Sequence, residues 1–65
     1  MLEALKAKYK SEVMAAKANI DVYLTNPVGI GEHSDLVSAV DSEITKLATA
    51  KEKLIQVELI LEESV

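Results

Sequence analysis

The sequence predicts an all-α protein, an antiparallel two-helix hairpin. Both glycines and the one proline of the 65-residue chain lie between Asn26 and His33. The segments on either side are rich in Ala, Leu, Lys and Glu, which are good helix formers. Their apolar residues recur every three or four positions, as on one helix face. We therefore expect one domain, with helices at about 2–25 and 34–63 and a loop at about 26–33.

The apolar residues of each segment define a predicted core stripe. In the first segment the steps between them average 3.5 residues, and in the second they are also threes and fours. This spacing favours two neighbouring helices that cross at a shallow angle, as in a coiled coil. The first stripe is Leu2, Leu5, Tyr9, Val13, Ala16, Ile20 and Tyr23, and the second is Leu36, Val40, Ile44, Leu47, Ala50, Leu54, Val57 and Leu61.

The residues around the loop predict where the helices end. Pro27 disfavours the α conformation at the preceding residue, so the first helix should stop near Thr25 or Asn26. Ser34 is a candidate N-cap of the second helix, with Asp35 placed well against the positive end of the helix dipole. No Glu or Gln follows Ser34 by three residues, which leaves open an earlier start, around residues 31–32.

The distribution of charge supports the antiparallel pairing. Residues 1–25 carry four Lys and three acids, whereas residues 26–65 carry three Lys and eight acids. An antiparallel hairpin brings basic residues near the start of the chain to acidic residues near its end. The basic residues are Lys6, Lys8 and Lys10, and the acidic ones are Glu58, Glu62 and Glu63.

Composition also limits the classes of partner. The chain has no Arg and a net charge of −4, which argues against binding to a nucleic acid backbone. It lacks the run of about 20 apolar residues that a membrane span needs, so we expect a soluble protein that does not enter membranes. Without Cys it has neither disulfides nor thiolate metal ligands. A chain this short is marginal as a lone globule, so association is the expected source of further stability.

The end of the second segment indicates where association occurs. Ile55 and Leu59 are four residues apart and form, with Ala48, a second row beside the core stripe, while Ile60 widens the stripe from its other side. One partner helix cannot cover all of these side chains, and contiguous apolar surface usually marks an association site. We expect a homo-oligomer, first of all a dimer that forms a four-helix bundle. A different protein that covers the same surface is the alternative.

The loop region invites a chemical interpretation, which its spacing does not support. Glu32, His33, Ser34 and Asp35 are consecutive, so their side chains cannot converge as those of a catalytic triad do. With one His and no Cys, we expect no catalytic residue, no bound metal and no cofactor. The loop could instead be the docking tip for a partner. Its candidate residues are Asn26, Pro27, Gly29, Gly31 and His33.

The string Asn-Pro-Val-Gly-Ile-Gly-Glu-His at 26–33, followed by Ser-Asp-Leu-Val at 34–37, resembles short uncharacterised proteins encoded by tailed bacteriophages of marine bacteria. The resemblance implies a phage or marine metagenomic origin, and with it a place in the cytoplasm of an infected bacterium or in a virion. It implies no activity, cofactor or catalytic residue.

The function that we expect is that of a small, non-enzymatic oligomerisation or interaction module. The alternative is a small acidic regulator that docks its exposed apolar stripe on a host or phage protein and changes that protein's activity.

Overall fold

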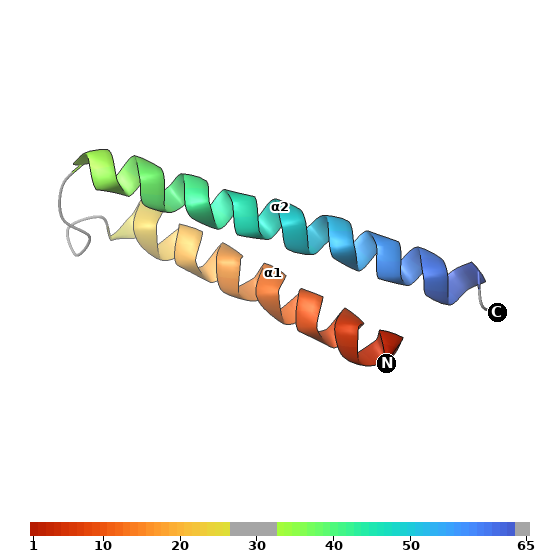
Figure 1. The fold of residues 1–65 in the computed structure, drawn as a ribbon. Coiled ribbons are helices and arrows are strands. Elements are labelled where there is room, and N and C mark those ends of the chain that lie inside the picture. The colour runs from red at the N-terminus through yellow and green to blue at the C-terminus, as the bar shows by residue number, and fades with distance from the viewer. Residues whose placement is uncertain (27–32, 64–65) are drawn as a thin grey trace.

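The computed structural model describes residues 1–26 and 33–63, with the side chains of 1–26 and 35–63. Over these residues the chain is all-helical and has no strand. Helix α1 spans Leu2–Thr25 and helix α2 spans His33–Glu63. The two helices lie side by side and antiparallel in a rod that measures 50 × 15 × 14 Å, as Figure 1 shows. The predicted helical hairpin is confirmed.

Next to the loop, helix α1 ends at Thr25 and helix α2 begins at His33. Helix α1 ends at Thr25, and the Asn26 amide, with φ −140° and ψ 63°, still donates to the Val22 carbonyl at 2.8 Å. The Thr25 hydroxyl donates to the Asp21 carbonyl at 2.7 Å. Helix α2 begins at His33, and the side chain of Ser34 lies outside those described, so its role as an N-cap stays a prediction. Pro27, Gly29 and Gly31 of the predicted docking loop lie outside the described residues.

The core lies in the seam between the helices. Ala16 and Ala50 are 3% exposed and Val57 is 6% exposed. The other predicted core residues are half-buried, with one exception. The prediction for Ile44 is wrong, because its side chain is 49% exposed and Glu43, at 6%, occupies the seam instead. Each step of four residues turns the side chain by about 40° around the helix, so two successive steps, from 36 through 40 to 44, turn it by about 80°, away from the seam. Alternating steps of four and three residues keep the side chains at the seam.

Contacts between the helices confirm their antiparallel register. Lys6 Nζ lies 4.0 Å from a carboxylate oxygen of Glu58. Lys53 Nζ lies 5.5 Å from the centre of the Tyr9 ring, and Lys8 Nζ lies 5.9 Å from it. Both cations are within the range of a cation–π interaction. Residues near the start of α1 are therefore level with residues near the end of α2.

Neither α1 nor α2 contains an apolar stretch long enough to cross a membrane.

Candidate interaction surface

A straight row of exposed apolar side chains runs along α2, and we call it the α2 row. Its spacing is seven, four, seven and four residues, which at 100° per residue keeps all members within an arc of about 60°. The larger members are far more exposed than core residues, at 72% for Val37, 49% for Ile44, 49% for Ile55 and 44% for Leu59. The α2 row consists of Val37, Ile44, Ala48, Ile55 and Leu59.

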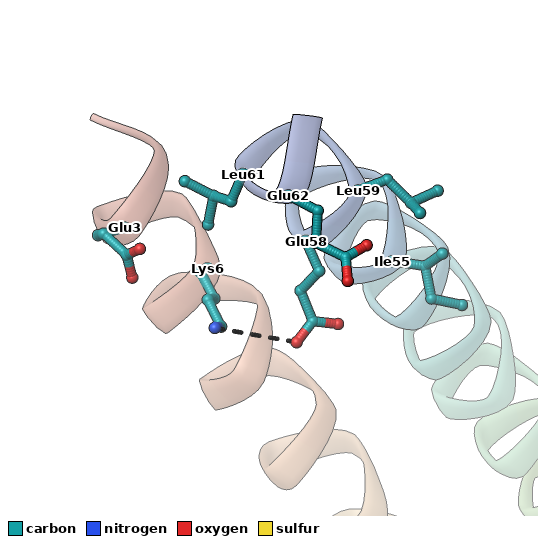
Figure 2. A pocket seen from close by; sticks show the side chains of 7 residues that line it. All are labelled: Glu3, Lys6, Ile55, Glu58, Leu59, Leu61 and Glu62. Carbon is teal, nitrogen blue, oxygen red and sulfur yellow. Dashed lines mark ion pairs between the residues drawn. The ribbon is translucent and has the colours of Figure 1, made fainter. Parts of the chain in front are cut away.

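Helix α1 does not cover this row. The row lies about 120° around α2 from the core seam, so its side chains leave the helix on another side. Figure 2 shows Ile55 and Leu59 extending away from α1, while Glu58 reaches across to Lys6. The hairpin therefore satisfies one face of α2 and leaves a second apolar face exposed to solvent.

Shallow grooves lie at both ends of the row. The groove near the loop end is largely apolar and includes Leu24 of α1, which is 67% exposed. The groove at the open end of the hairpin combines apolar and charged side chains (Figure 2). The first is lined by Leu24, Leu36, Val37, Val40, Asp41 and Ile44, and the second by Glu3, Lys6, Ile55, Glu58, Leu59, Leu61 and Glu62. Both grooves therefore include charged side chains, Asp41 at the loop end and Glu58 among others at the open end.

The opposite flank of the seam carries a polar cluster centred on Glu43, and we call it the polar flank. The side-chain amide of Asn19 donates to one carboxylate oxygen at 3.0 Å, and Lys46 Nζ donates to the other at 3.1 Å. These bonds, that from Asn19 first, and the charge of Lys46 hold the pKa of Glu43 below its usual value, against the opposing effect of burial. Among the described residues, no buried side-chain nitrogen or oxygen lacks a hydrogen-bond partner.

The residues predicted for association therefore fall on two sides of α2. Ala48, Ile55 and Leu59 lie on the α2 row. By its helical position Ile60, 45% exposed, lies across the seam, on the flank of Lys46 and Glu43. Whether any of these four residues contacts a partner stays a prediction.

Two candidate residues of the docking loop, Asn26 and His33, lie next to the loop at the ends of the two helices. Asn26 is exposed, and the side chain of His33 lies outside those described. Within the described part of the chain, no three acidic or histidine side chains are grouped so that they could hold a metal ion. The expectations that this protein has no metal, no cofactor and no catalytic residue stay predictions.

Comparison with protein-family models, with curated proteins and with solved structures found no match to this chain. The resemblance to phage proteins, and the origin and location that it implies, accordingly stay predictions.

Sequence reasoning misses two members of the exposed row. Val37 is outside the predicted association surface, and Ile44 is predicted for the core. A signal for both is present, because positions 37, 44, 48, 55 and 59 repeat with an average near 3.7 residues and so trace a line parallel to the helix axis. A search for a second apolar period on α2 would find it.

Proposed function

We propose that this protein is a non-enzymatic helical module that acts by association, first of all with a second copy of itself. The observation that carries the proposal is the α2 row, a face of four large apolar side chains and Ala48 that the hairpin leaves exposed. Exposed apolar surface that is contiguous, in contrast to scattered single side chains, marks interaction sites. A pair of hairpins would bring four helices together.

The thin core supports the same proposal. None of the large side chains in the described residues is fully buried, and the three buried apolar residues are two Ala and one Val. Burial of apolar area contributes about 25 cal/mol per Å², so a hairpin alone gains little from so small a core. Covering the α2 row would add the missing apolar burial.

The test is the solution mass of the wild-type chain and of a variant that carries Ile55→Glu with Leu59→Glu, measured by light scattering after size exclusion. We expect an oligomeric wild type, with a dimer as its first state, and a monomeric or unfolded variant, because two charges on the row cannot be buried unpaired. The matched control carries Met14→Glu with Val22→Glu. These residues are 71% and 54% exposed but lie on α1, so the control should keep the wild-type mass.

Either of two results would contradict the proposal. A wild-type chain that is a folded monomer at high concentration does not self-associate. Equal loss of assembly in the control would show that added charge, and not the α2 row, governs the mass. In the first case the same row becomes the surface on which to seek a different protein.

A further inference from the structure

We infer that the second copy packs α2 against α2 in antiparallel orientation, with the two-fold axis passing close to Ala48. This inference rests on the proposed self-association and adds its geometry. The surface that pairs is the α2 row, and the two α1 helices lie on the outside of the assembly. The α2 row of one copy is thus covered by the α2 row of the other copy.

The first support is that the two end residues of the row are equally far from Ala48. Val37 and Leu59 each lie eleven residues from Ala48, in opposite directions. A two-fold interface must be self-complementary, so that a residue on one side meets its counterpart on the other. In the antiparallel arrangement Val37 meets Leu59 of the second copy at both ends. Ile44 and Ile55, four and seven residues from the centre, then interleave along the contact, and Ile55 is level with Asp41 of the second copy.

The size of the side chain at the centre fits the same axis. A residue on a two-fold axis meets its own copy, and a bulky side chain there would hold the helices apart. Ala48 is the smallest member of the row and is exposed in the hairpin. Two helices can therefore approach closely at the midpoint, while the larger side chains pack on both sides of it.

The second support is the exposed area. The hairpin exposes 4817 Å². A compact folded monomer of 7.1 kDa would expose about 4,100 Å². The excess, about 700 Å², is close to the roughly 800 Å² that each partner contributes to a stable interface of ordinary size. The row spans 22 residues, or about 33 Å of helix, which is long enough to supply such an interface.

The position of the row determines where α1 lies. Because the row is about 120° around α2 from the core seam, a helix packed on it touches α2 and not the far side of α1. Both α1 helices then flank a central pair of α2 helices. This arrangement is more open than a square bundle, in which each helix has two neighbours at about 90°.

Disulfide trapping tests this geometry directly, since the natural chain has no Cys. We expect the Ala48→Cys variant to form a covalent dimer under mild oxidation, because its two thiols face each other across the axis. The matched control is Thr49→Cys, which replaces the next residue, also exposed, on the polar flank. It should remain uncrosslinked under the same conditions.

A second pair of variants fixes the orientation. Val37→Cys alone and Leu59→Cys alone should not crosslink, because identical positions are about 33 Å apart in the antiparallel dimer. A mixture of the two variants should give the mixed dimer. Self-crosslinking of the Val37→Cys chain would show a parallel dimer and overturn the inference. Stronger crosslinking of the Thr49→Cys chain than of the Ala48→Cys chain would show that the polar flank forms the interface.

The mass of the unmodified chain separates the inference from the proposed function. A wild-type dimer whose Ala48→Cys variant does not crosslink contradicts only the α2 pairing, and the module still self-associates. A monomeric wild type contradicts the proposed function and the inference together. Circular dichroism of each Cys variant verifies that the helices are intact.

Discussion

Glu43 is the residue whose environment departs most from expectation. It occupies a seam position that the alternation of four- and three-residue steps assigns to an apolar side chain, and its neighbour Ile44 is exposed in its place. Asn19 and Lys46 together satisfy both carboxylate oxygens. A polar residue in a helical seam is known to specify register at a cost in stability. The bond from Asn19 joins the two helices and is formed only when they are in this register.

Glu43 should make stability depend on pH in the acid range. Its folded-state pKa is lowered, so the contribution is fully present above the unfolded value, near 4.5, and is lost as the pH falls through the lower folded-state pKa. We expect the wild type to have a higher urea midpoint than Glu43→Gln at neutral pH, and the two midpoints to converge as the pH falls below 4.5.

The Asn19→Ala background provides the control for this pH dependence. The hydrogen bond from Asn19 is the main cause of the lowered pKa of Glu43. Without it, the urea midpoints of the chains with and without Glu43→Gln should differ less at neutral pH. They should also become equal at a higher pH than in the wild-type background. If the Glu43→Gln substitution changes the urea midpoint by the same amount at every pH in both backgrounds, the hydrogen bond does not couple ionisation to folding.

At the scale of the element, α2 carries two apolar faces with two different functions. Its seam alternates steps of four and three residues and packs on α1, where Ala50 and Val57 are buried. Its second face is the exposed α2 row, about 120° away. Helix α1 has one continuous apolar face, and its exposed Met14 and Val22 stand apart from each other around the helix. The interaction surface therefore lies mainly on α2, with Leu24 of α1 in the groove at its loop end.

The close approach of the helices should make the seam intolerant of larger side chains. Ala50 is 3% exposed, so Ala50→Leu adds three carbon atoms at a buried position of the seam, and overpacking of this kind costs about 1–3 kcal/mol. The measurement is the free energy of unfolding in urea. The control is Ala18→Leu on the exposed surface of α1, which should cost far less. Equal losses would indicate that the seam at Ala50 is loosely packed.

At the scale of the whole molecule, the hairpin is a thin rod with more surface than a compact protein of its mass. It is 50 Å long and about 15 Å thick, so every helix has solvent on most of its circumference. The fraction of surface that a small domain can bury is low, and such domains commonly gain stability from partners. Stability of this molecule should accordingly depend on its concentration.

Thermal unfolding should show that dependence. If folding and association are coupled, the melting temperature rises with protein concentration by mass action. We expect a clear rise for the wild type over about a hundredfold range of concentration, measured by circular dichroism in the helix band. If the variant with Ile55→Glu and Leu59→Glu folds as a monomer, its melting temperature should be the same at every protein concentration. A wild-type melting temperature that is independent of concentration would show that the hairpin is stable alone.

The sequence by itself determined the secondary structure, the antiparallel pairing and most of the core. Helix formers fill both segments, Pro27 stands just after the end of α1, and the basic start of the chain lies opposite its acidic end, as the Lys6–Glu58 pair confirms. These features depend on local propensity, on helical spacing and on the sign of the charges. All three can be read from the order of the residues.

Only the tertiary structure decided which side chains the seam buries and which it leaves exposed. The alternation of steps points to position 43, but the preference of a seam for apolar side chains points to Ile44, so the sequence alone gives conflicting signals. Only the structure shows that Glu43 occupies the seam, where its carboxylate accepts a hydrogen bond from Asn19 of the other helix. The same holds for the α2 row: whether Val37, Ile44, Ile55 and Leu59 are covered depends on where α1 lies around α2, and that is a property of packing between helices.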